Sequence, residues 1–76
     1  MNVNGGWHKV IKESFPTQRE IQVLQCVADG NSRALIAKLL GISTHTVNAH
    51  INSARAKLGA KTTPHAISIL KEKNCI

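Results

Sequence analysis

Asn48 and Asn52 stand four residues apart, so in a helix they would lie on one face. An asparagine side chain can donate to N7 of adenine and accept from its N6 amino group in the major groove of DNA. Ala49 lies beside them and is small and apolar enough to contact a thymine methyl group. These three residues are the candidates for base contact, and the competing interpretation is an ordinary solvated helix face.

A second set of polar and basic residues could bind the phosphate backbone of a nucleic acid. Ser43 and Thr44 open the same segment, where the N–H groups and dipole of a helix N-terminus favour an anion. The residues predicted to contact phosphate are Asn31, Ser32, Arg33, Ser43, Thr44, Thr46, His50, Arg55 and Lys57. The competing interpretations are helix capping by Ser43, plain solvation of the basic side chains, and a partly buried, hydrogen-bonded His50.

These side chains need a scaffold, and residues 33–51 (RALIAKLLGISTHTVNAHI) have the pattern of a helix-turn-helix. Ala37 supplies a small residue where two helices would cross, and Gly41 tolerates the positive φ that ends the first helix. Val47 supplies an apolar residue that the second helix can bury against the first. The space between the helices would be filled by Ile36, Leu40, Ile42 and Ile51. The pattern predicts a protein that reads the DNA major groove.

The flanking sequence predicts further helices. Thr17 and Glu20 have the spacing of a capping box, and Pro16 precedes them. The first expected helix runs from the Thr17 cap to Asp29–Gly30, and the second from an Asn31 or Ser32 cap to about Leu40. The third runs from Thr44 to about Leu58, and Gly59 ends it. The fourth begins at a Thr63 cap, with Pro64 as its first helical residue. Apolar and polar residues nowhere alternate with a period of two. The predicted fold class is therefore all-α, a four-helix bundle with a central helix-turn-helix.

The domain organisation follows from the same pattern. Residues 15–76 are expected to form the helix-turn-helix domain, and residues 1–14 an N-terminal arm or linker. Trp7, Val10, Ile11 and Phe15 recur at helical spacing, which predicts a short helix or a docked linker over residues 7–14.

Composition narrows the class of protein. The chain has 76 residues, of which 42% are hydrophobic and 3% aromatic, so a single domain with an aliphatic core is expected. Lys and Arg outnumber Asp and Glu by 10 to 4, giving a net charge of +6. This excess favours a polyanionic partner such as double-stranded DNA, although a merely soluble basic surface is the alternative.

Several other classes of protein are disfavoured. The sequence contains no signal-peptide pattern and no apolar run near ~18 residues, so neither secretion nor membrane binding is expected. Cys26 and Cys75 do not form a disulfide framework and fit a reducing cytoplasm. The four histidines lack metal-ligand spacing, so no metal or cofactor is expected. No nucleophile–base pair or phosphate-cradling glycine loop is present, and the prediction is that the protein is not an enzyme.

One combination of residues carries a family resemblance: Thr17, Arg19, Glu20, Val23, Leu24, Gly30, Ile36, Ala37, Leu40, Ile42, Ser43, Thr46, Val47, His50, Lys57, Leu58, Gly59 and Ala66. With these residues, the run from Thr17 to Leu70 resembles the C-terminal DNA-binding domain of LuxR/FixJ-type (GerE-like) bacterial transcription regulators. Within that family, the TVNAH sequence is most similar to the quorum-sensing branch.

The resemblance implies a four-helix domain whose third helix enters the major groove and whose fourth helix forms a dimer contact. It also implies a sensory domain, either an acyl-homoserine-lactone binder or a phosphoacceptor receiver, which this chain does not contain. The chain is thus interpreted as the effector domain of a quorum-sensing regulator or response regulator, or as a small stand-alone regulator.

The last predicted helix is the candidate for a dimer interface. Ala66, Ile67, Ile69 and Leu70 make an apolar stripe that is wider than one packing face requires. We therefore predict a homodimer interface at these four residues. The alternative is that all four belong to the core of the monomer.

The sequence departs from the family pattern at two positions. Asn48 and Thr63 stand where relatives often carry a cation. The absence of a cation at position 48 keeps a second hypothesis open, in which the domain docks RNA polymerase or another regulator without binding DNA. The promoter-recognition region of sigma factors has a related fold, but the TVNAH and KLG signatures argue against it.

Overall fold

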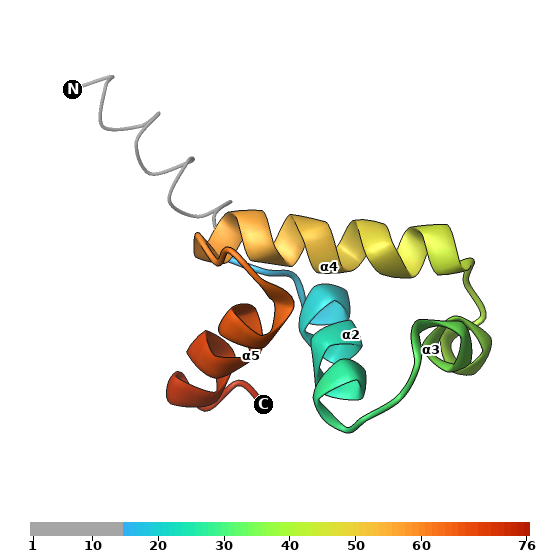
Figure 1. The fold of residues 1–76 in the computed structure, drawn as a ribbon, viewed down its shortest axis with the longest axis horizontal. Coiled ribbons are helices and arrows are strands. Elements are labelled where there is room, and N and C mark those ends of the chain that lie inside the picture. The colour runs from blue at the N-terminus through green and yellow to red at the C-terminus, as the bar shows by residue number, and fades with distance from the viewer. Residues whose placement is uncertain (1–14) are drawn as a thin grey trace, which may run out of the picture.

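The computed structural model describes residues 15–76, and this part of the chain is helical. Its helices are α2 (Gln18–Ala28), α3 (Arg33–Leu40), α4 (Thr44–Leu58) and α5 (Thr63–Glu72), as Figure 1 shows. The predicted all-α fold class is confirmed. The arm predicted over residues 1–14, with its short helix, lies outside the described residues.

The longest helix, α4, runs across the other three (Figure 1). Its N-terminal end lies over α3, its middle over α2 and its C-terminal half over α5. Both α2 and α4 contact every other described helix. The three shorter helices therefore support α4 from one side and leave its opposite side uncovered.

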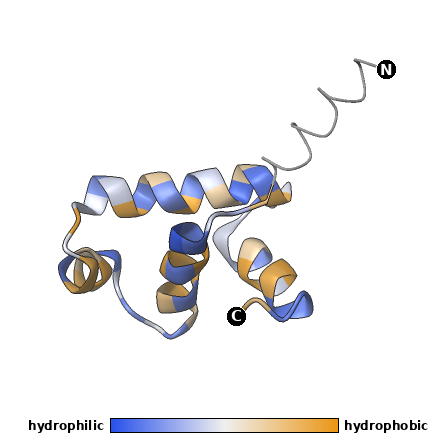
Figure 2. Ribbon diagram, turned by 180° about the vertical axis from the view of Figure 1, so that it is seen from behind, coloured by the Kyte–Doolittle hydropathy of each residue, from blue (hydrophilic) through white to orange (hydrophobic). Residues whose placement is uncertain are grey.

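The core between these helices is aliphatic, as the composition predicts. The largest fully buried side chains are Val23, Leu24, Ile36, Val47 and Leu70. Figure 2 shows why α4 is only partly buried: hydrophilic and hydrophobic residues are interspersed along it, whereas the middle of α5 is mainly hydrophobic. Across residues 15–76, no helix combines the length and the apolar character that crossing a bilayer requires.

The predicted helix-turn-helix is formed by α3, α4 and the turn between them. Gly41 ends α3 in the left-handed conformation at φ 68°, a conformation that glycine adopts without a Cβ penalty. The next amide, Ile42 N–H, donates to the Ala37 carbonyl. Ala37 is 8% exposed and Val47 is 0% exposed. The roles predicted for Ala37, Gly41 and Val47 are confirmed.

Side-chain caps set where each helix begins. Thr17 and Glu20 form the predicted capping box, and Ser43 accepts from the Thr46 amide at the start of α4. Of the two caps predicted for α3, Ser32 is the one present. The cap of α5 is Thr62, which accepts from the His65 amide, so the predicted cap, Thr63, is one residue too late and Pro64 is the second helical residue.

Candidate nucleic-acid interface

The three residues predicted to contact bases share the uncovered side of α4. Asn48, Ala49 and Asn52 are all exposed, because the neighbouring Val47 and Ile51 are the residues that α4 turns into the core. Nothing in residues 15–76 covers this face. It is therefore open to a partner molecule.

One flank of this face borders a hollow that we call the polar concavity. It has a volume of about 380 Å³ and is lined by Arg33, Asn48, Ile51, Asn52, Arg55 and Thr63. Its walls come from the start of α3, the middle of α4 and the start of α5. The fold thus brings two predicted phosphate contacts, Arg33 and Arg55, beside the two asparagines.

Arg55 is held in place by the protein itself. Its Nη2 donates to the backbone carbonyl of Lys61, in the loop before α5, at 2.6 Å. Its Nη1 lies 3.4 Å from Oδ1 of Asn52. Its Nε is buried and has no hydrogen-bond partner among residues 15–76. The guanidinium is therefore positioned before any partner binds.

The opposite flank of α4 faces α2 and carries Lys57, another of the predicted phosphate contacts. The Nζ of Lys57 lies 3.1 Å and 3.2 Å from the two carboxylate oxygens of Glu20. The side chains of Lys57 and Glu20 are 25% and 7% exposed. Its charge is thus paired with a buried carboxylate, away from the polar concavity, and contact of Lys57 with phosphate stays a prediction.

The Glu20 carboxylate is ionised because several donors surround it. Burial alone raises the pKa of Glu20, but the Thr17 backbone N–H, the Ser53 hydroxyl and the Lys57 ammonium lower it. The net result is a pKa below the usual value of 4.5. Glu20 therefore caps α2 and neutralises Lys57 at the same time.

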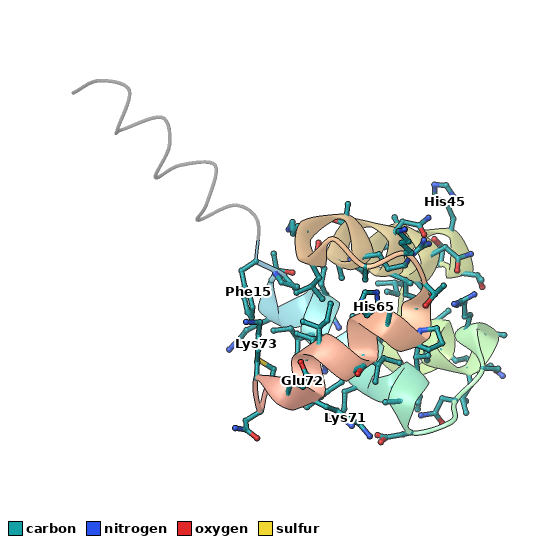
Figure 3. The ribbon with its side chains drawn as sticks, turned by 60° about the vertical axis from the view of Figure 1, so that its left-hand side comes forward. Phe15, His45, His65, Lys71, Glu72 and Lys73 are labelled. Carbon is teal, nitrogen blue, oxygen red and sulfur yellow. The ribbon has the colours of Figure 1, made fainter. Side chains whose placement is uncertain are left out.

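The start of α4 carries further predicted phosphate contacts. Ser43 caps the helix, and its hydroxyl lies 2.9 Å from that of Thr46, while Thr44 is exposed. His45, which no prediction singled out, points away from the body of the domain (Figure 3). Its spacing of four residues from Ala49 places it on the same helix face, and that spacing is the signal that could have identified it.

Three other predicted phosphate contacts have structural roles or lie elsewhere. Asn31 donates from Nδ2 to the Cys26 carbonyl and closes the end of α2. Ser32 accepts from the Leu35 amide as the cap of α3. His50 is half-buried and lies on the Lys57 side of α4, outside the polar concavity. Only Arg33, among the residues at the start of α3, lines the hollow.

The apolar stripe of α5 is not the continuous dimer surface that we predicted. Ala66 and Leu70 are 0% exposed, so they belong to the monomer core and cannot form an interface. Ile67 and Ile69 are two positions apart, on different sides of the helix, and each packs partly against the core. The outer side of α5 instead carries His65, Lys71 and Glu72 (Figure 3).

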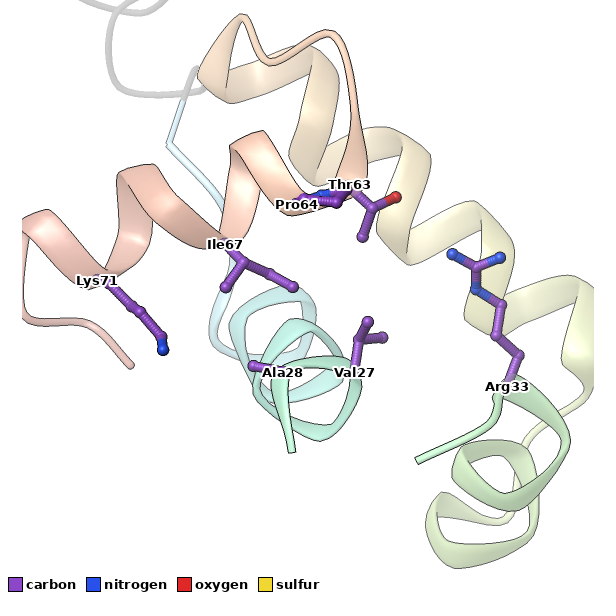
Figure 4. Close-up of a pocket in the computed structure, with 7 residues that line it drawn as sticks. All are labelled: Val27, Ala28, Arg33, Thr63, Pro64, Ile67 and Lys71. Atoms are coloured by element: carbon purple, nitrogen blue, oxygen red, sulfur yellow. The ribbon is translucent and has the colours of Figure 1, made fainter. Parts of the chain in front are cut away.

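A second hollow lies between α2, the start of α3 and α5 (Figure 4). Its volume is about 500 Å³, and its lining consists of Val27, Ala28, Arg33, Thr63, Pro64, Ile67 and Lys71. The apolar side chains lie between the two cations, Arg33 and Lys71. This apolar groove is distinct from the polar concavity, although Arg33 and Thr63 border both.

Comparison with known proteins gives a consistent result. Residues 16–70 match the family model described as bacterial regulatory proteins, luxR family. The transcriptional regulatory protein TdiR of Thauera aromatica is 51% identical over 47 residues, which are 62% of this chain and 21% of that protein. The transcriptional activator protein EchR of Dickeya chrysanthemi is 40% identical over 76 residues, 100% of this chain and 30% of that protein.

The transcriptional regulatory protein YdfI of Bacillus subtilis is 35% identical over 64 residues, 84% of this chain and 30% of that protein. The chain therefore spans less than a third of the length of these three relatives. No solved structure matches the chain.

Proposed function

The chain belongs to the luxR family of bacterial regulatory proteins, and we propose that it regulates transcription by binding specific sequences of double-stranded DNA with α4 in the major groove. The similarity to regulators such as TdiR and EchR supports a role in transcription. The geometry of α4 supports the finer proposal.

The observation that carries this proposal is the uncovered face of α4. It presents Asn48, Ala49 and Asn52, which are short enough to let a helix approach base edges closely. Arg33 and Arg55 lie at its side in the polar concavity, and the charge of Arg33 can attract the phosphate backbone. A helix in the major groove reads base edges with side chains on one face, while flanking groups contact phosphate and fix its position.

Phosphate contacts would come from the residues around this face. Arg33 stands at the N-terminus of α3, and Ser43, Thr44 and Thr46 stand at the N-terminus of α4, where amide groups favour anions. Each phosphate neutralised by the protein contributes a slope of about −0.9 to the dependence of log affinity on log salt concentration. A net charge of +6 suits this interaction.

We also propose that two copies bind one operator, with half-sites about 34 Å apart or at a multiple of this spacing. Because Ala66 and Leu70 are buried, the contact on α5 would have to use Ile67 together with the polar outer side of that helix. Sedimentation of the domain with and without a two-site duplex would measure this pairing. A one-to-one complex on that duplex would contradict it.

The central experiment is a gel shift against random-sequence duplex at low salt, followed by selection of bound sequences from a random pool. The domain should retard the duplex and enrich a defined sequence. A variant with Asn48→Ala and Asn52→Ala should still bind at low salt but enrich a different or degenerate sequence. Arg19→Ala is the matched control, because Arg19 is exposed on α2 and contacts Gln22. No retardation at any salt concentration would contradict the proposal.

A second candidate function is a docking module for RNA polymerase or another regulator. Two observations favour it: Asn48 carries no charge, and the apolar groove of Figure 4 could receive an apolar side chain flanked by acidic residues. The same gel shift separates the two functions, since a domain that only docks proteins does not retard DNA.

A further inference from the structure

Arg55 contacts the side chain of Asn52, and a residue that only binds phosphate does not need such a contact. Its guanidinium places Nη1 3.4 Å from the Oδ1 atom of Asn52, one helical turn earlier on α4. This distance is long for a hydrogen bond, so the interaction is mainly that of a cation with the amide dipole. The positive charge attracts the amide oxygen and turns the NH₂ group away from itself.

The guanidinium stays beside Asn52 because its other end is fixed. Nη2 donates to the Lys61 carbonyl at 2.6 Å, a short charge-assisted bond to the backbone of the loop before α5. The planar guanidinium can serve two acceptors at once, which a lysine ammonium does with less geometric control. Arg55 therefore links the loop before α5 to a side chain on the proposed reading face.

We propose that Arg55 is a positioning residue that decides which base Asn52 reads. With its oxygen drawn toward Arg55, Asn52 offers the groove its two N–H donors. Guanine presents two acceptors, O6 and N7, in the major groove, whereas adenine presents N7 beside an N6 amino donor. The nearby cation further disfavours an amino group. Asn52 is then a reader of guanine, and not of adenine as asparagine commonly is.

This inference rests on the proposed function and refines it. The competing role for Arg55 is the one expected from its charge alone, a contact to phosphate. A phosphate contact affects all sequences alike and adds to the salt dependence, whereas a positioning role acts on one base position. The two roles therefore differ in measurable quantities.

The test compares sequences selected from a random duplex pool by the wild type, Arg55→Met, Asn52→Ala and the double variant. The base position read by Asn52 is the one whose preference disappears in Asn52→Ala. The wild type should prefer guanine there, and Arg55→Met should shift the preference toward adenine by about five- to a hundredfold. In the Asn52→Ala background, Arg55→Met should change no base preference, since Arg55 acts through Asn52.

Salt titrations supply the second readout. If Arg55 only positions Asn52, Arg55→Met leaves the log–log salt slope unchanged, whereas loss of a phosphate contact reduces its magnitude by about 0.9. Arg55→Lys keeps the charge and serves as the second variant if Arg55→Met does not fold. It should relax the guanine preference while preserving the slope.

Two results would overturn the inference. One is a wild type that already selects adenine at the Asn52 position. The other is an Arg55 variant that loses affinity equally for all sequences and keeps its base preference. Neither resembles failure of the proposed function, in which the wild type itself would enrich no sequence.

Discussion

The two flanks of α4 carry two cations, Arg55 and Lys57, that are two positions apart in sequence and have different surroundings. Arg55 lines the open polar concavity and is held by a backbone carbonyl and the Asn52 amide. Lys57 faces α2 and is paired with the buried Glu20 carboxylate. The Arg55 flank is open to the partner that we propose, whereas the Lys57 flank is paired within the domain.

The difference between Arg55 and Lys57 shows that the charge of a basic residue is not enough to assign that residue a role in nucleic-acid binding. Residues two apart on a helix lie on nearly opposite sides, so neighbouring cations on α4 meet different environments. Glu20 is buried because the capping box fixes it at the start of α2, and it draws Lys57 inward. Substitutions on the two flanks of α4 test this division between recognition and stability.

The largest expected effect on stability is on the Lys57 flank. Lys57→Ala leaves the Glu20 carboxylate buried without its cation, and we expect a loss of about 2 kcal/mol in the free energy of unfolding. This is less than for a fully buried pair, since the Lys57 side chain is a quarter exposed. Denaturant unfolding measures it.

The matched variant is Glu20→Gln, which keeps an acceptor for the capping box but removes the ion pair. In the Glu20→Gln background, Lys57→Ala should cost much less. The division between the flanks would be wrong if Lys57→Ala left stability intact and reduced the salt slope of DNA binding.

The next prediction concerns base discrimination by the two asparagines on the uncovered face of α4. Asn48→Ala and Asn52→Ala should each change base discrimination by roughly 1–3 kcal/mol at one position of the selected sequence. Stability should change little, because both side chains are exposed. Selection from a random pool together with thermal unfolding measures both quantities. Equal loss of affinity for every sequence would show that the asparagines contact only the backbone.

Much of the fold could be predicted from the sequence because its signals are local. Gly41 ends α3 with a positive φ, and Ser32 and Ser43 cap the helices that follow them. Each of these roles depends on residues within one turn of the chain. The exception is α5, where Thr62 and Thr63 are both able to cap and only the three-dimensional structure identifies Thr62.

The candidate site was less predictable because its geometry depends on distant residues. Lys57 and Glu20 meet across α2 and α4 although 37 positions separate them, and no local pattern reports such a pair. Likewise, Ala66 and Leu70 were assigned to a dimer interface because the sequence does not show which helices cover α5. The Lys61 carbonyl that holds Arg55 belongs to the backbone and has no signature in the sequence.

A smaller effect is expected on the pH dependence of the free energy of unfolding. The pKa of Glu20 is lower in the folded domain than its usual value of 4.5. The ionised carboxylate therefore stabilises the fold above about pH 4.5, and this stabilisation is lost as the pH falls through the lowered folded pKa. Denaturant unfolding across this range should show the loss in the wild type and a flatter profile in Glu20→Gln. Identical profiles would show that Glu20 is not the group responsible.

The smallest effect is expected at the start of α4, where stability and recognition meet in one residue. Ser43 caps the helix through the Thr46 amide, and Ser43→Ala should lower the free energy of unfolding by about 1 kcal/mol. Ser43→Asp should keep the cap, since aspartate is an equally good N-cap, but it places a negative charge where we expect a phosphate. We therefore predict near wild-type stability and weaker binding to all DNA sequences for Ser43→Asp. Undiminished DNA affinity in this variant would limit Ser43 to capping and move the phosphate contacts of α4 away from its N-terminus.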